Sequence, residues 1–479
     1  SQEVEYFRPD TDGHIAFYGA SGSGKTTALR SLAIAAGITP SSGPVNVYAL
    51  DFAGGGLDML KKLPSVGNVI QGDDEERIAK LIDFLGSIVD ERSVSYKAVN
   101  ASHLTSYREL SGKQDEPRYL VLIDGIATFA ETYQLVGRHA KIWSRFQQIL
   151  SDGREVGVHF AVSADRPQAI PNSIAASFQR KVVLRLTDED AYLYFNLPRD
   201  VLSASSAPGR AMQVGNPNLL QLPILGRNVT DYDQAREIES LAGASFMRRR
   251  TRPTPIRSLP LDIPEREVDR VVDGRPVIGV EAGSLGPMPL RPGGTFAITG
   301  PAQSGRTNTV RWLARSVHSA FPNAVMLHAC ARRSLVAREP LWTETAQGAD
   351  KIASMLAKHG HLFEEEAPET TPGVVLFVEG IGEFSFSACD QQLQDAIASA
   401  KANGHLVVAE ADVSGWSFGG SLASGVRSGR TGIVLCPSPG EGENAVGVPV
   451  PGIFGAEAVP GRGYFVQSGK QWKVQVPRV

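Results

Sequence analysis

Two short stretches of the chain carry residues whose types and spacing suit phosphate chemistry. The first, residues 19–26, reads GASGSGKT, in which Gly19 and Gly24 let the backbone turn its N–H groups toward phosphate oxygens. In this pattern Lys25 bridges the β- and γ-phosphates of a nucleotide, and Thr26 supplies a hydroxyl to Mg²⁺. The predicted nucleotide-binding residues are Gly19, Ser21, Gly22, Ser23, Gly24, Lys25, Thr26 and Thr27.

A carboxylate that completes the metal site is expected at the end of another apolar strand. The stretch YLVLIDG fits, because its Asp124 follows a buried-strand pattern and can hold Mg²⁺ through water. Lys25 and Asp124 are therefore the predicted catalytic residues, and Thr26 and Asp124 the predicted Mg²⁺ ligands. The predicted cofactors are ATP and Mg²⁺.

The group that would orient an attacking water is missing from its expected position. Many hydrolytic sites of this pattern have a glutamate directly after the aspartate, where this chain has Gly125. Glu131 or Asp165 could substitute, and the sequence does not choose between them. We expect the site to bind ATP–Mg²⁺ well and to hydrolyse it slowly. Four arginines near loop ends are candidates for contact with a neighbouring subunit's phosphate, although a structural salt bridge is the favoured role for each one taken singly: Arg154, Arg166, Arg180 and Arg210.

The second phosphate-loop stretch, GPAQSGRT at residues 300–307, is an altered copy of the first. Gly300, Gly305 and Thr307 keep the loop pattern, but Arg306 replaces the lysine, and a guanidinium is bulkier than an ammonium group. The matching acidic strand, VVLFVEG, ends in Glu379 in place of aspartate, again followed by a glycine. We expect this second site to bind nucleotide weakly or not at all.

The elements that must position these residues recur in the same order in both halves. In the first half, strand patterns at 14–19, 45–52, 118–125, 157–164 and 181–186 alternate with helical ones such as 25–36 and 73–100. The second half repeats loop, acidic strand and later strands, and both halves close with Pro-Gly-Arg. The predicted fold is α/β: two tandem RecA-like P-loop NTPase domains, each a mainly parallel sheet flanked by helices.

Domain boundaries follow from this repeat. We predict an ATPase domain with an intact loop at 1–245, a linker at 246–267 and a degenerate ATPase domain at 268–479. The linker holds a cluster of four arginines at 248–252 and several prolines, which preclude a long helix. Its apolar residues in the stretch 256–263 predict that it packs on a domain surface.

Composition excludes several classes of protein. Lys plus Arg total 48 against 51 Asp plus Glu, so the chain lacks the basic excess of a nucleic-acid motor. No apolar run is long enough to span a bilayer, and the three cysteines are too few and scattered for a disulfide framework or a zinc site. We expect a cytoplasmic setting, and the short stretch before the first loop indicates a piece of a longer protein.

The motifs together resemble a known family. The run GHIAFYGASGSGKTTALRSLA, VYALDFAGGGL, YLVLIDG, GVHFAVSADRP and PGRA, followed by GPAQSGRTNTVRWLA, RTGIVLCPSPGEGE and VPGRGYFVQSG, resembles the FtsK/SpoIIIE-type ATPases. It is similar, more narrowly, to the last two ATPase domains of the EccC family of type VII (ESX) secretion. In that family transmembrane helices and a more active ATPase domain precede these two.

The resemblance implies partners and a division of labour. The expected partners are the other EccC domains or subunits of a membrane secretion complex, with stacking or hexameric rings as assemblies. The terminal domain is expected to recognise the C-terminal signal of a WXG100-type substrate, and the apolar linker stretch 256–263 to lie on the first domain. Two alternatives stay open: a double-stranded DNA translocase, which the charge balance disfavours, and a scaffolding pseudo-ATPase.

Overall fold

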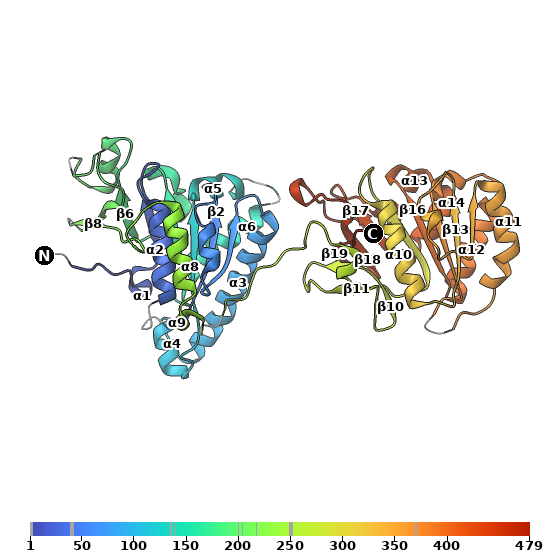
Figure 1. The fold of residues 1–479 in the computed structure, drawn as a ribbon, viewed down its shortest axis with the longest axis horizontal. Helices are drawn as coiled ribbons and strands as arrows, with labels where there is room; N and C mark the ends of the chain where they lie inside the picture. Colours follow the sequence, from blue (N-terminus) through green and yellow to red (C-terminus); the bar gives the residue numbers. More distant parts are fainter. Residues whose placement is uncertain are drawn as a thin grey trace. The chain divides into compact units, whose positions relative to one another are not determined.

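The chain divides into two α/β units, Ser1–Arg257 and Ser258–Val479. They are seen in a computed structural model that describes residues 3–38, 43–134, 137, 139–199, 201–203, 205–216, 218–248, 252–368 and 371–479 (Figure 1). The division falls inside the predicted linker. Arg249 and Arg250 of its basic cluster lie outside the described residues. No helix in the described ranges is long and apolar enough to cross a membrane.

The first unit is built on a sheet of eight described strands in the order β3-β2-β4-β5-β1-β6-β7-β8. β1 to β6 are parallel, and β7 and β8 continue the sheet in antiparallel fashion. The strands are β1 (Ile15–Tyr18), β2 (Val45–Asp51), β3 (Val66–Gln71), β4 (Arg118–Asp124), β5 (Val158–Ala164), β6 (Arg180–Leu184), β7 (Arg210–Gln213) and β8 (Leu219–Gln221). β1, β4 and β5 are buried along their whole length, as expected for parallel strands covered on both faces.

Helices cover both faces of this sheet (Figure 1). Apolar residues of α2 and α8 pack on one face, and those of α3 to α6 on the other. The helices are α1 (Pro9–Asp12), α2 (Lys25–Ile38), α3 (Glu75–Ala98), α4 (Leu104–Ser111), α5 (Ile126–Tyr133), α6 (Ala140–Asp152), α7 (Asn172–Ala175), α8 (Asp231–Ala242) and α9 (Ser245–Arg248). α3 begins where the sequence predicts, because Asp74 accepts a hydrogen bond from the N–H of Arg77 at its first turn.

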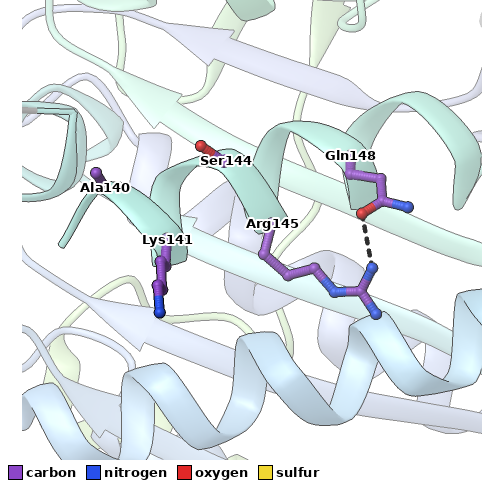
Figure 2. A pocket seen from close by; sticks show the side chains of 5 residues that line it. All are labelled: Ala140, Lys141, Ser144, Arg145 and Gln148. Carbon is purple, nitrogen blue, oxygen red and sulfur yellow. Dashed lines mark hydrogen bonds between the residues drawn. The ribbon is translucent and has the colours of Figure 1, made fainter.

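A shallow hollow follows α6 where this helix packs on α3 (Figure 2). Within it Arg145 donates to Gln148 Oε1 (2.6 Å) and forms an ion pair with Asp90 of α3. The hollow is lined by Ala140, Lys141, Ser144, Arg145 and Gln148. None of these residues belongs to the phosphate loop, so we assign the hollow to helix packing.

The second unit repeats the strand order of the first. Its path β14-β13-β15-β16-β12-β17-β18-β19 matches β3-β2-β4-β5-β1-β6-β7-β8 strand for strand, with β9, β10 and β11 added beyond β19. The strands are β9 (Val271–Val272), β10 (Arg275–Glu281), β11 (Pro287–Pro289), β12 (Gly294–Thr299), β13 (Val325–Cys330), β14 (Glu344–Gln347), β15 (Val374–Glu379), β16 (Leu406–Ala411), β17 (Thr431–Leu435), β18 (Arg462–Gln467) and β19 (Lys470–Gln475). The predicted fold class is confirmed.

The helices of the second unit also lie on both faces of its sheet. α10 packs on one face, and α11 to α14 with α15 on the other. They are α10 (Arg306–Ala320), α11 (Ala349–His359), α12 (Asp390–Asn403), α13 (Val413–Phe418), α14 (Gly420–Arg427) and α15 (Glu443–Val446). α11 ends at His359 and the chain continues as a 3₁₀ turn, Gly360–Phe363, because glycine is a poor helix former.

The linker is shared between the two units. Ile256 is buried in the first unit's core, and Tyr48 donates its hydroxyl to Thr254 O (2.6 Å). Leu259 and Ile263 pack instead against Val280 and Ala282 of the second unit. The expectation that the whole stretch 256–263 lies on the first domain is therefore wrong for Leu259 and Ile263. Their apolar side chains fit the surface left by the added strand β10.

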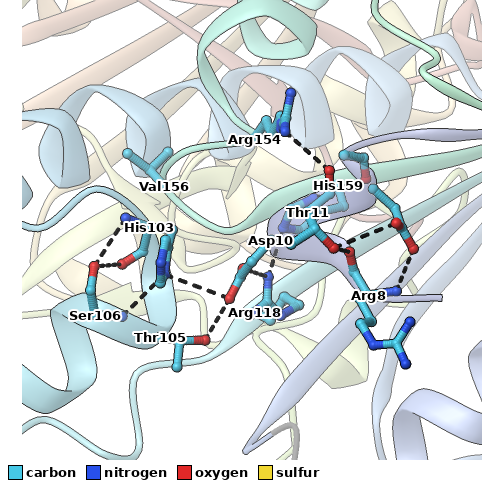
Figure 3. Close-up of polar contacts among 12 residues, drawn as sticks. Arg8, Asp10, Thr11, His103, Thr105, Ser106, Arg118, Arg154, Val156 and His159 are labelled. Carbon is cyan, nitrogen blue, oxygen red and sulfur yellow. Dashed lines mark hydrogen bonds and ion pairs between the residues drawn. The ribbon is translucent and has the colours of Figure 1, made fainter. Parts of the chain in front are cut away.

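A buried polar network joins the segment before β1 to the amino-terminal ends of β4 and β5 (Figure 3). Arg118 lies between Asp10 and His159, with its Nη1 2.7 Å from His159 Nε2. His14 contacts Leu150 O through Nε2 (2.8 Å) and accepts the N–H of Phe160 at Nδ1 (3.0 Å). Both imidazoles must therefore be neutral, because each has one nitrogen that accepts an N–H.

This network predicts that the first unit loses stability on acidification. Burial lowers the pKa of His14 to about 4 from 6.5, and burial likewise holds the pKa of His159 well below its usual value. As the pH is lowered, the histidines of the unfolded chain become protonated before those of the folded chain. The free energy of unfolding therefore decreases as the pH is lowered from 6.5 to about 4. For His14 alone the loss is about 3 kcal/mol, measurable by urea unfolding at a series of pH values.

The control for this prediction is His14→Gln. Its amide can accept from Phe160 N and donate to Leu150 O without titrating, so the pH dependence should become shallower. An unchanged dependence in this variant would contradict the assignment to His14.

Candidate nucleotide site and its altered copy

The predicted phosphate loop of the first unit connects β1 to α2. It lies at the carboxyl ends of the parallel strands, and α2 begins at Lys25, so the positive end of the helix dipole faces the loop. Ser23 is buried, Ser21 and Gly22 are exposed, and Thr27 is half-buried in the first turn of α2. The structure thus places all eight predicted nucleotide-binding residues in one loop and helix turn.

A glycine of the Pro-Gly-Arg motif closes this loop. Gly209 donates its N–H to Ser23 O (2.8 Å), and a side chain at Gly24 would approach Gly209 N to 3.1 Å. Gly24 also has φ +109, which disfavours any other residue. The sequence reasoning treated Pro-Gly-Arg only as a landmark of the repeat. The occurrence of Pro-Gly-Arg after both phosphate loops is the sequence feature that could have indicated its place in the site.

Lys25 lies folded over the loop. Its Nζ donates to Gly19 O (2.6 Å) and Ala20 O (2.9 Å). Burial lowers the pKa of Lys25, and the negative charges of Asp124 and Asp165 oppose that shift. Its partners are neutral carbonyls, so a phosphate can replace them without breaking an ion pair.

Thr26 and Asp124 meet as the sequence predicts. The Thr26 hydroxyl donates to Asp124 Oδ2 (2.7 Å), and Asp124 is 1% exposed at the end of β4. Ser163 of β5 donates to the other carboxylate oxygen and accepts the N–H of Gly125 (2.8 Å). Ser163 therefore fixes the direction of the carboxylate. Sequence reasoning missed this residue, because a serine near a strand end carries no signal of its own.

A water-orienting side chain at the position after Asp124 would be strained and crowded. Gly125 has φ +87, and a Cβ there would lie 3.3 Å from Phe52 Cβ. Of the two proposed substitutes, Asp165 is close enough to Lys25 to affect its pKa, whereas no described contact joins Glu131 to the loop. Both side chains are exposed, and Asp165 also pairs with Arg166 (3.2 Å).

A glycine-rich loop after β2 borders the site. Asp51 holds it by accepting the N–H groups of Ala53, Gly55 and Leu57 at 2.9–3.1 Å. Arg30 of α2 donates to Gly56 O (2.6 Å). These hydrogen bonds hold the stretch LDFAGGGL beside α2. They explain why the motif has an aspartate followed by a glycine-rich loop.

The candidate arginines fall into two groups. Arg154 donates to Gln179 and Thr11 O, and Arg180 pairs with Asp12 (2.6 Å) and Glu5 (2.8 Å), so these two have structural roles. Arg166 and Arg210 are exposed. No ion pair of Arg210 occurs among the described residues, which leaves its guanidinium available to a neighbouring molecule.

The second loop has the same place, between β12 and α10, but different side-chain partners. Arg306 Nη1 lies 2.5 Å from Glu410 Oε1 of β16. Glu379, the counterpart of Asp124, contacts His328 Nε2 (2.8 Å). Thr307 is exposed and, within the described part of the chain, makes no hydrogen bond to Glu379. The arrangement of Thr26, Asp124 and Lys25 in the first unit is therefore not reproduced in the second.

The first site fits ATP and Mg²⁺ on three observations. Ser23 Oγ is buried and has no hydrogen-bond partner among the described residues, the glycines form a cradle that a Cβ would fill, and the Thr26 hydroxyl already points at Asp124. Thr26 and Asp124 would hold the metal, and Lys25 with the loop N–H groups would hold the phosphates. The second copy differs at the charged groups, because its loop cation, Arg306, is already paired with Glu410.

Fold and site together define a class: two RecA-like P-loop domains in tandem, the first with a complete phosphate site. Residues 2–212 match the model of the FtsK/SpoIIIE family. The first unit of the chain is therefore similar to that family over most of its length.

Relatives of the chain are ESX secretion proteins. The ESX secretion system protein YukB of Bacillus subtilis is 24% identical over 496 residues, which cover 97% of this chain and 32% of YukB. The ESX-1 secretion system protein EccCb1 of Mycobacterium tuberculosis is 24% identical over 326 residues, 64% of this chain and 54% of EccCb1. The chain thus spans about a third to about half the length of these curated relatives.

Solved structures share the fold over both units. EssC (ATPases 2 and 3) from Geobacillus thermodenitrificans has a TM-score of 0.77 at 21% identity, covering all of this chain and 94% of that one. Thermomonospora curvata EccC (ATPases 2 and 3) in complex with a signal sequence peptide has a TM-score of 0.62 at 21% identity, covering 98% and 88%.

Proposed function

We propose that the chain is the ATPase portion of an EccC-type component of a type VII secretion system. Its first unit binds ATP–Mg²⁺, and its second unit is a degenerate ATPase domain that docks a secreted protein. It acts at the cytoplasmic face of the membrane within a larger complex of EccC domains or subunits. The observation that supports the nucleotide role is the direct contact of Thr26 with Asp124 beside Lys25.

The residues of the first unit have distinct tasks in this proposal. Bound ATP would supply a phosphoryl group for slow transfer to water. Lys25 neutralises its charge, Thr26 and Asp124 hold Mg²⁺, and Ser163 keeps Asp124 in place. The exposed guanidinium of Arg210 is suited to a phosphate of an adjacent subunit.

Slow turnover is the expected kinetic result. Because Gly125 provides no general base, we expect steady-state phosphate release about a hundredfold or more below that of an ATPase with a positioned base. Phosphate release from the purified chain at saturating ATP and Mg²⁺ measures it. Brisk release that Lys25→Ala abolishes would instead mean that another residue, such as Asp165, acts as the base.

The docking role rests on the apolar surface of the second unit. In the second unit Met355, Leu356, Phe363 and Phe384 are buried in the core, but Phe386 is 96% exposed. Phe418 is 83% exposed. The two phenylalanines lie near each other, because their chain neighbours are joined by a hydrogen bond from Ser385 to Gly419 O (2.9 Å).

We assign this pair of phenylalanines to the C-terminal signal of a WXG100-type substrate, in keeping with the ESX relatives. The test is titration of the full chain with a fluorescent C-terminal peptide of such a substrate. A scrambled peptide and a DNA duplex serve as controls. Saturable peptide binding that F386S/F418S weakens is expected; binding of the duplex alone would favour a DNA translocase.

A further inference from the structure

The two phosphate loops share one backbone conformation although their side chains differ. Ser23 O accepts the N–H of Gly209, and Ser304 O accepts the N–H of Gly461, both at 2.8 Å. Gly22 has φ +68, and Gln303 at the matching position has φ +64, which is unusual for a residue with a side chain. The second loop thus keeps a phosphate-binding shape, with some backbone strain.

Glu410 stands where the first unit has Ser163. The register of β15 and β16 pairs Glu379 with Glu410, and that of β4 and β5 places Asp124 beside Ser163. The contacts agree, because Gly380 donates its N–H to Glu410 Oε2 (3.2 Å) as Gly125 does to Ser163 Oγ. A neutral hydroxyl in one unit is therefore a carboxylate in the other.

This carboxylate is mostly buried and is paired with the cation of the loop. The Glu410 side chain is 13% exposed and that of Arg306 is 24% exposed. Burial raises the pKa of Glu410, Arg306 opposes the rise, and the nearby charge of Glu379 adds to it. A cation that contacts loop carbonyls in the first unit thus contacts a fixed anion in the second.

We propose that Glu410 is an internal substitute for a nucleotide phosphate, and that it is the residue that excludes ATP from the second unit. A polyphosphate entering the loop would have to displace Glu410 from Arg306. It would then lie beside two partly buried carboxylates, Glu379 and Glu410, and like charges at such distances repel strongly in a protein interior.

In this proposal Glu410, and not the replacement of lysine by Arg306, is the main reason why the second loop does not bind ATP. Arg306 retains the positive charge and lies at the start of α10, where phosphate binding is favourable. The longer, forked guanidinium serves to reach Glu410. The second unit is then held in one conformation by its own ion pair, which suits a docking domain that must not change with nucleotide. This inference goes beyond the proposed function, which needs only that the second site is degenerate.

The experiment removes Glu410 in a chain whose first site is disabled. In a Lys25→Ala background, binding of N-methylanthraniloyl-ATP with Mg²⁺ is compared for Arg306→Lys, Glu410→Gln and the double variant E410S/R306K. We expect no gain for Arg306→Lys, and a single saturable site in the other two, with affinity raised by about tenfold or more. The double variant reproduces the first unit's serine and lysine, so it covers the case in which Glu410→Gln alone fails to fold.

Glu339→Gln is the matched control. Glu339 forms ion pairs with Arg311 and Arg315 of the same helix α10, outside the phosphate loop. Its replacement removes a similar ion pair and should create no nucleotide site. Thermal unfolding of every variant shows that the chain is folded.

Two outcomes would overturn the proposal. One is that Arg306→Lys alone creates the site; the other is that the folded Glu410 variants bind no better than their parent. Failure of the proposed function has a separate signature, since the Lys25→Ala chain would then already bind one nucleotide. In that case a tenfold gain from Glu410→Gln would still support the role of Glu410, and no gain would reject it.

Discussion

Lys25→Ala is expected to reduce the affinity of the full chain for ATP–Mg²⁺ by about a hundredfold, or about 3 kcal/mol. Among the described residues the Lys25 side chain donates to the loop carbonyls Gly19 O and Ala20 O and forms no ion pair, so its removal should leave the fold intact. The loss is therefore one of direct charge–phosphate contact. Isothermal titration of the wild-type and variant chains measures both affinity and the number of sites.

Two further variants sharpen this experiment. Lys25→Arg copies the second loop into the first and should also weaken binding, because a guanidinium does not replace an ammonium group in so tight a loop. Arg306→Lys should leave the single site of the wild-type chain unchanged. Full-strength ATP binding by Lys25→Ala would show that the nucleotide lies elsewhere in the chain.

The second large effect concerns stability. Arg462 of the second Pro-Gly-Arg is fully buried, donating through Nε to Gln475 Oε1 (2.8 Å) and through Nη2 to Leu259 O (3.2 Å) and Pro260 O (2.9 Å). Arg462→Met removes the donor for these three acceptors, of which the bonds to Gln475 and Leu259 are buried. We expect the free energy of unfolding of the second unit to fall by about 4 kcal/mol, and its urea midpoint by about 2 M.

Intrinsic fluorescence separates the two units in this measurement. The second unit contains Trp312, Trp342, Trp416 and Trp472, and the first contains Trp143. Arg478→Met is the matched control, because Arg478 is exposed and pairs with the exposed Asp262, so its loss should not shift the midpoint measurably. Equal midpoints for the two variants would show that Arg462 does not anchor the linker.

Much of the fold could be predicted from local patterns. Strands such as β4 and β5 read as continuous apolar runs, and the order of motifs in the two halves indicated a repeated α/β domain. β3 and β14 were missed, because short edge strands with polar residues look like loops until a neighbouring strand pairs with them. β10 was missed as well, and with it the surface on which Leu259 and Ile263 pack.

Part of the candidate site could likewise be predicted from the sequence, and part could not. Gly19 to Thr27 are contiguous, and a phosphate loop is a local backbone structure, so the sequence by itself determined that part together with Asp124 at a strand end. It also determined that Arg306 and Glu379 depart from the pattern. Tertiary structure decided the rest, because Ser163, Gly209 and Glu410 reach the loops only through strand neighbours far apart in the chain. Whether Arg306 meets a phosphate or a carboxylate depends on strand register, which no local sequence pattern records.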